Sequence, residues 1–182
     1  MPTSLDDFSA LLVVDLQVAT VAAPFARPVA EVVDATAALA ADFRKHGRPV
    51  VYAVSTGTPA GRNAYGSEPR VFPEAGQVLA PGLDAHDDDL RVARAGLSIF
   101  NGTGLDERLR ELGVETVVVT GVATTFGVES TVRSAYDLGF NVVVVSDAVT
   151  DMRAETHAHA FENVFPAVAQ IATAEEVSDS LS

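Results

Sequence analysis

The stretch VVVTGVATTFGVESTVRSAYDLGFNVVVVSDA, from Val117 to Ala148, decides the fold that this sequence predicts. It begins and ends with apolar, β-branched runs, residues 117–120 and 142–145, and the segment between them has the apolar spacing of a helix. Two continuous apolar strands that flank one helix are typical of a βαβ unit in a parallel sheet buried on both faces. The turn GVATTFG, residues 121–127, leads from the first strand into the helix. In an open α/β sheet, ligands bind at this carboxyl edge, where the helix has free N–H groups.

Beyond this unit, predicted strands and helices alternate along the whole chain. Apolar β-branched runs predict strands, and apolar residues at intervals of three and four predict helices. The predicted strands are residues 10–16, 49–54, 90–93, 117–120, 142–145 and 167–172, and the predicted helices outside the central unit are residues 28–46, 105–112, 152–164 and 174–181. This alternation predicts an α/β fold, a doubly wound three-layer sandwich with a mostly parallel sheet of about six strands. We expect residues 1–182 to form a single domain.

One long segment interrupts the alternation. Residues 55–89 are rich in glycine, proline and polar side chains. Because this segment is too long for a simple connection, we expect it to be a functional loop or a lid over the site.

Composition and charge narrow the classes of function. The chain has 182 residues, a formal net charge of −13 and no cysteine. An acidic chain is repelled by phosphate backbones and anionic membranes, so we expect neither nucleic acid nor membrane as a partner. The lack of cysteine excludes disulfides, thiol nucleophiles and thiolate metal sites. The chain shows neither the basic start and apolar core of a signal peptide nor an apolar run long enough to span a bilayer, so we expect a cytoplasmic protein.

Asp15 is the first candidate for chemistry. It ends an apolar strand at the predicted ligand edge, where partial burial would raise its pKa and suit it to act as a general acid or base. A carboxylate that caps a neighbouring loop or helix fits the same position, and the residue alone leaves both interpretations open. The histidines, His46, His86, His157 and His159, lack the spacing of helical metal ligands and are interpreted as surface or core residues.

The turn of residues 121–127 is the second candidate. Its glycines and small residues let backbone N–H groups approach a ligand oxygen. The turn carries neither G-x-G-x-x-G nor G-x-x-x-x-G-K-[ST], so no dinucleotide or P-loop site is indicated. An ordinary strand-to-helix turn, with glycine for close packing, is the alternative.

Taken together, these motifs resemble one known family. The runs VVDLQ at 13–17, SIFNGTGLDERLRELG at 98–113 and TGVATTFGVESTVRSAYDLGFNVVVVSDA at 120–148 are similar to the isochorismatase-like hydrolases. The resemblance covers nearly the whole chain, from residue 11 to about residue 172. It implies the fold described above and an enzyme that hydrolyses a small molecule without a cofactor.

The resemblance also implies roles for particular residues. Most members of the family are cysteine amidases that use an aspartate after the first strand, a lysine before an S-x-F motif and a cysteine at the start of the central helix. These positions fall on Asp15, Arg94 and Gly127. A cis peptide bond of the family would fall between Val122 and Ala123.

Two of the three catalytic positions depart from the family pattern. Gly127 stands at the cysteine position of a chain without cysteine, which excludes a thiol amidase. Glycine there resembles the isochorismatase branch, in which the aspartate protonates the methylene carbon of a vinyl ether, water adds and pyruvate leaves. Asp15 would then be the general acid, held by Arg94. A guanidinium also lowers a carboxyl pKa and cannot give up its proton, so Arg94 would either keep Asp15 anionic or grip a substrate carboxylate.

Several residues are candidates for substrate binding. The turn residues implied to bind a substrate oxygen or to wall the pocket are Val122, Ala123, Thr124 and Phe126. Gln17 either contacts substrate or bonds to backbone as a strand-end amide. Arg62 and Arg70 either bind an anionic substrate or are solvated, and Phe100 and Phe126 either wall an apolar pocket or belong to the core.

The sequence therefore predicts an isochorismatase-like hydrolase without a thiol nucleophile, acting on a small anionic substrate with Asp15 as general acid or base. Vinyl ether hydrolysis of isochorismate or a relative is the specific form. An isomerase or lyase that uses Asp15 and Arg94 without water is a second interpretation, and a non-catalytic member that binds a ligand or partner is a third. The resemblance implies a homo-oligomer, a dimer or tetramer, and no metal site.

Overall fold

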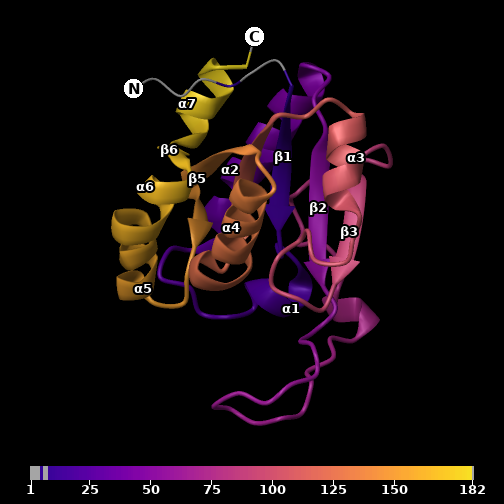
Figure 1. Cartoon of the computed structure of the whole chain (residues 1–182), viewed down its shortest axis with the longest axis vertical. Coiled ribbons are helices and arrows are strands. Elements are labelled where there is room, and N and C mark those ends of the chain that lie inside the picture. The colour runs from indigo at the N-terminus through magenta and orange to yellow at the C-terminus, as the bar shows by residue number, and fades with distance from the viewer. Residues whose placement is uncertain (1–4, 6–7, 182) are drawn as a thin grey trace.

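A computed structural model of the chain describes residues 5 and 8–181, and its centre is one parallel sheet (Figure 1). The described strands are β1 (Ser9–Val14), β2 (Val50–Ser55), β3 (Leu90–Arg94), β4 (Thr116–Val122), β5 (Asn141–Thr150) and β6 (Gln170–Ala172). They lie in the order β3-β2-β1-β4-β5-β6, and every neighbouring pair is parallel. The predicted doubly wound α/β fold is confirmed.

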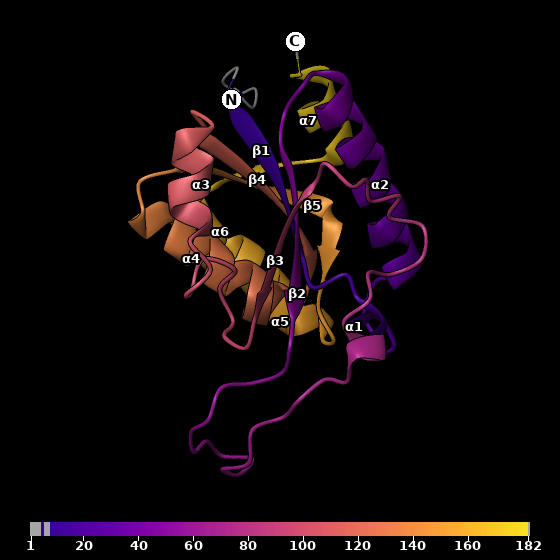
Figure 2. The same cartoon turned by 90° about the vertical axis from the view of Figure 1, so that its right-hand side faces the viewer.

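Helices cover both faces of the sheet. The longer ones are α2 (Val29–Lys45), α3 (Leu105–Glu111), α4 (Glu129–Asp137), α5 (Ala154–His159) and α7 (Ala174–Asp179). The shorter turns are α1 (Val18–Val21), η1 (Glu74–Gly76), the π-helical η2 (Thr124–Val128) and η3 (Ala160–Val164), and α6 (Phe165–Val168). Figure 2 views the sheet nearly edge-on, with α2 and α7 on one side and α3 and α4 on the other.

Burial on both faces explains why the strands are continuously apolar. In β1, Leu11 and Val13 pack with α2, while Leu12 and Val14 pack with α3 and α4. Every residue of β1 and of β4 is buried. A strand between two helical layers has no solvent face, so its sequence cannot alternate between apolar and polar residues.

Some predicted boundaries are wrong near the C-terminus. The helix expected over 152–164 begins at Ala154 and continues through η3 and α6 to Val168, so the last strand starts at Gln170 rather than at 167. The second strand of the central unit is longer than expected, because β5 runs on to Thr150 after a register shift against β4. The short helix α1 has no apolar period and was not predicted.

The expectation of a lid over residues 55–89 is also wrong for its first half. Residues 57–71, which we call the arm, project away from the body beyond the carboxyl ends of the strands (Figures 1 and 2). The second half returns to the body, where Leu79 pairs with Gln17 and Ala80 and Leu83 are buried. In the described part of the chain, no helix has the length and apolar character needed to cross a membrane.

The strand order fixes where a ligand site can form. From β1 the chain winds outward through β2 to β3, then returns to the other side of β1 to place β4, β5 and β6. Helices that follow β1 and β4 therefore lie on opposite faces, and the carboxyl ends of two such strands are where open α/β sheets bind ligands. Residues 15–17 and 121–127 leave the sheet at that point.

Candidate active site

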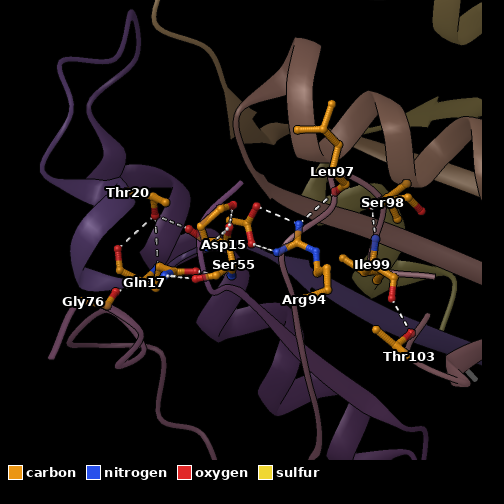
Figure 3. Close-up of polar contacts among 12 residues, drawn as sticks. Asp15, Gln17, Thr20, Ser55, Gly76, Arg94, Leu97, Ser98, Ile99 and Thr103 are labelled. Atoms are coloured by element: carbon orange, nitrogen blue, oxygen red, sulfur yellow. Dashed lines mark hydrogen bonds and ion pairs between the residues drawn. The ribbon is translucent and has the colours of Figure 1, made fainter. Parts of the chain in front are cut away.

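The centre of the site is an ion pair between Asp15 and Arg94 (Figure 3). Arg94 Nη1 donates to Asp15 Oδ1 over 2.5 Å and Nη2 to Oδ2 over 2.8 Å. Arg94 Nη2 also donates to the Leu97 carbonyl over 2.9 Å, which fixes the guanidinium from the other side. Both residues are buried, with 8% of Asp15 and 5% of Arg94 exposed. A planar guanidinium that meets both carboxylate oxygens holds the carboxyl group in one orientation.

Burial decides the protonation of this carboxyl group. Removal from water disfavours the charged form and raises the pKa of Asp15 above its ordinary value, and the hydrogen bonds and charge of Arg94 offset this only in part. The sequence left open whether Arg94 keeps Asp15 anionic. The structure favours a carboxyl group that accepts a proton more readily than an exposed aspartate does.

The backbone conformation of Asp15 sets where its side chain lies at the end of β1. Asp15 has φ of +55°, a left-handed conformation that breaks β1 at this residue. The Asp15 carbonyl accepts hydrogen bonds from the Gln17 N–H and from the Thr20 hydroxyl, which tie the bend to α1. Non-glycine residues seldom adopt this conformation unless the surroundings hold them there, and such positions cluster at functional sites.

Gln17 supports the bend and does not face a ligand. Its side chain is fully buried, Nε2 donates to the carbonyls of Ser55 and Gly76, and Oε1 accepts from the Ser55 N–H (Figure 3). The alternative of an amide bonded to backbone is therefore confirmed, and the two bonds from Nε2 use both of its hydrogens. The amide joins the ends of β1 and β2 to the returning loop at η1.

Glycine at position 127 leaves room for the Asp15 carboxyl group. A Cβ atom built at Gly127 would lie 2.9 Å from Asp15 Oδ2 and 3.0 Å from Val14 Cγ1. Both separations are closer than a methyl group tolerates without movement of its neighbours. Gly121 is constrained in a similar way, since a Cβ there would lie 2.0 Å from the Val14 carbonyl oxygen. The two glycines allow the turn after β4 to pass directly against the end of β1.

The turn itself is held by residues that follow β5. The peptide bond between Val122 and Ala123 is cis, at the position the resemblance implied. Asp151, 2% exposed, accepts hydrogen bonds from the Thr125 N–H over 2.7 Å and from the Thr125 hydroxyl over 2.8 Å. The Thr125 N–H is therefore not free for a substrate oxygen.

A histidine contacts the same turn. The Thr124 hydroxyl lies 2.8 Å from His157 Nδ1, and burial lowers the pKa of His157, with the nearby Arg27 adding to the effect. The imidazole is then neutral at pH 7, and its Nδ1 shares a hydrogen bond with the Thr124 hydroxyl. Sequence reasoning missed both Asp151 and His157 as parts of the site, because their contacts cross 26 and 33 residues of chain.

The remaining candidate residues divide into core and surface. The side chains of Val122 and Thr124 are buried, so any contact they make with a ligand comes from their backbone. Phe126 is 50% exposed, whereas Phe100 is buried and stacks on Phe140 in the core. Arg62 lies on the exposed arm and is not brought to the Asp15 site of its own chain.

The described residues do not form a metal site. Among the described residues, no three His, Asp or Glu side chains gather closely enough to hold a metal ion.

Comparisons with known proteins agree with this geometry. The isochorismatase domain model matches residues 9–176. The isochorismatase family protein YecD of Escherichia coli O157:H7, itself uncharacterized, is 35% identical over 183 residues, which is 95% of this chain and 96% of that protein. The ureidoacrylate amidohydrolase RutB of Variovorax paradoxus is 32% identical over 131 residues, covering 64% of this chain and 52% of RutB.

Solved structures show the same architecture. An isochorismatase family protein from Burkholderia thailandensis superposes with a TM-score of 0.94 at 34% identity, over 100% of this chain and 99% of the other. The two chains therefore share one fold over nearly their entire length. On these grounds the chain belongs to the isochorismatase family.

Proposed function

We propose that this chain hydrolyses a small anionic vinyl ether, of the kind found in isochorismate, with Asp15 as the general acid. The observation that carries the proposal is the state of the Asp15 carboxyl group, which is buried, oriented by Arg94 and shifted to a higher pKa. A general acid works best when its pKa is moved toward the working pH.

The reaction needs one proton donor and one water molecule. Asp15 transfers its proton to the methylene carbon of the vinyl ether, which leaves a cation stabilised by the ether oxygen. Water adds to the cationic carbon and returns a proton to the Asp15 carboxylate. The resulting hemiketal breaks its bond to the ring oxygen and releases pyruvate and the ring alcohol, so Asp15 ends as it began.

Arg94 would act on this reaction through Asp15. Its two bonds to the carboxylate use one lone pair on each oxygen, and the second lone pair on each remains for a proton or a water molecule. Gly127 stands next to Oδ2 without a side chain. No thiol is present to form a covalent intermediate. These features support direct protonation rather than acyl transfer.

Release of pyruvate from isochorismate by the purified protein, followed with lactate dehydrogenase and NADH, tests the proposal. Asp15→Asn is the test variant. Asp84→Asn is a matched control, because Asp84 also has a left-handed backbone, with φ of +48°, but an exposed side chain. We expect release by the wild type and by Asp84→Asn and none above background by Asp15→Asn. No release by the wild type would contradict the proposed substrate, and equal release by all three proteins would contradict the role of Asp15.

A further inference from the structure

The two sides of the arm, residues 57–71, are joined by backbone hydrogen bonds only at the base and at the tip. At its base, Gly57 pairs with Val71, and the Thr58 N–H donates to the Arg70 carbonyl over 2.8 Å. At its tip, the Asn63 N–H donates to the Gly66 carbonyl over 2.9 Å. The described residues between base and tip make no backbone hydrogen bond across the arm.

The arm has no apolar contact with the body of its own chain. Residues 58–71 are all exposed, Tyr65 completely and Val71 to 77%. Neither hydrophobic cluster of the described chain includes a residue of the arm. A two-stranded hairpin without a packed face is marginal in water, and ordering its residues costs conformational entropy. The extended shape therefore requires contacts that this chain alone does not supply.

The edge from which the arm projects has a complementary surface. Four apolar side chains there are 41–58% exposed, and they come from segments that surround the site: Val18, Val78, Leu97 and Phe126. The arm contains two arginines and one glutamate, so the rest of the chain carries a formal charge of −14. Arg62 and the exposed ring of Tyr65 lie near the tip of the arm. They suit a partner that is acidic and has exposed apolar side chains around its site. The second copy of this chain is such a molecule.

We propose that the arm docks on the carboxyl edge of a second copy of this chain and places Arg62 and Tyr65 at the rim of that copy's Asp15 site. From base to tip the arm has about seven residues, which span about 20 Å when extended, enough to cross onto a neighbouring molecule. A two-fold arrangement lets each copy give its arm and receive the other.

Arg62 is suited to this role because its charge is unused. Within the described part of the chain, its guanidinium makes no hydrogen bond or ion pair. Arg94, by contrast, is committed to Asp15 and to the Leu97 carbonyl. The partner's arm would then contribute a cation for the carboxylate of an anionic substrate. This role of Arg62 rests on the proposed function, whereas the docking of the arm does not.

The lack of cysteine makes a direct test possible. Tyr65→Cys introduces a single thiol at the tip, which takes a benzophenone maleimide. Equal amounts of ¹⁴N- and ¹⁵N-labelled variant are mixed, irradiated and digested, and mass spectrometry separates cross-links within one chain from those between chains. Glu111→Cys, an exposed position at the end of α3, is the matched control.

We expect cross-links of mixed isotope from position 65 to residues 15–20, 95–98 or 122–128, and none to these segments from position 111. Sedimentation is the second readout. We expect an oligomer for the wild type and at least tenfold weaker association when residues 60–68 are replaced by two glycines. A monomeric wild type, cross-links only within one chain, or mixed cross-links only to other segments would each overturn the docking.

The role of Arg62 is measured separately. We expect Arg62→Ala to raise KM for the anionic substrate about tenfold while weakening association less than the replacement of residues 60–68 does, and an unchanged KM would overturn this part alone. Sedimentation and cross-linking need no enzymatic activity. They therefore test the docking of the arm even if the proposed function is wrong.

Discussion

Two arginine–aspartate pairs stand at opposite ends of the same edge strand, and they hold their carboxyl groups in different states. At the end of β3, Arg94 binds Asp15, whose pKa burial raises despite the guanidinium. Before the start of β3, Arg44 binds Asp89 through Nε at 3.0 Å and Nη2 at 2.8 Å. Burial raises the pKa of Asp89 too, but the bonds from Arg44 and from the His86 N–H outweigh it, so that pKa lies below its ordinary value.

The difference comes from the surroundings and not from the pair itself. Asp89 Oδ2 accepts a second bond from the His86 N–H over 2.6 Å, and Arg44 is also bound by Tyr52. These contacts stabilise the carboxylate and connect α2 to the sheet. Around Asp15, which lies beside Gly127, burial outweighs the bonds from Arg94 and from the Ser55 backbone, so the balance falls the other way. Pairs of the same two residue types therefore differ: the pair before β3 stabilises a carboxylate and joins α2 to the sheet, and the pair at the end of β3 would orient the proton donor of the proposed reaction.

The largest expected difference is between Asp15→Asn and Asp89→Asn in the rate of pyruvate release. We expect Asp15→Asn to lower pyruvate release by about 10²–10⁴-fold, the usual contribution of a general acid. Asp89→Asn should leave the rate within about twofold, because Asp89 lies at the opposite edge of the sheet. Steady-state rates of both variants at one pH measure this, and similar losses in both would contradict the separation.

A methyl group at position 127 should disturb the Asp15 pair and leave the Asp89 pair unchanged. Gly127→Ala places a Cβ 2.9 Å from Asp15 Oδ2, so the carboxyl group or the turn must move. We expect a loss of about 1–3 kcal/mol in the free energy of unfolding, as for other overpacked sites, together with most of the activity. Urea denaturation and pyruvate release measure the two effects. Full activity in this variant would show that the position of the carboxyl group does not matter.

The pH dependence of kcat/KM should shift when the Arg94 guanidinium is removed and stay unchanged when that of Arg44 is removed. Because the protonated Asp15 is the active form, the rate should fall as pH rises through the Asp15 pKa, which lies above the ordinary value of 3.8. Arg94→Met removes the interactions that lower this pKa, so the fall should shift to higher pH. Arg44→Met should leave the profile unchanged. Profiles of kcat/KM against pH decide this, and a shift to lower pH in Arg94→Met would contradict the assignment.

The smallest effect concerns stability in acid. Asp89 has a lowered pKa, so its pair stabilises the native state above the unfolded value of 3.8 and ceases to do so as pH falls through the native pKa. We expect Asp89→Asn to be less stable than the wild type by about 1 kcal/mol at pH 7, with a smaller difference at pH 3. Urea denaturation at the two pH values tests this. A constant difference would mean that Asp89 acts by packing rather than by charge.

The fold and the centre of the site could be predicted because their signals are local. The apolar runs of β1, β4 and β5 specify buried parallel strands, and Asp15 stands where the first run stops. The resemblance then identified Arg94 and Gly127 as the altered positions. Those predictions needed only the order of residues along the chain and the rule that ligands bind at a switch in strand order.

The rest of the site depends on contacts between distant segments. Nothing near Gln17 in the sequence shows that Ser55 and Gly76 will take its amide bonds. Nothing near Asp151 in the sequence shows that its carboxylate will hold Thr125, 26 residues earlier in the chain. The state of Asp15 could not be predicted either, because it depends on the balance between burial and Arg94.

Titration of the aspartate carboxyl carbons by ¹³C NMR tests the central claim most directly. Asp15 and Asp89 are assigned from the signals that disappear in Asp15→Asn and Asp89→Asn. We predict that Asp15 titrates above the ordinary aspartate value and Asp89 below it. If Asp15 titrates at or below the ordinary value, Arg94 keeps it anionic, and Asp15 is not the proton donor proposed here.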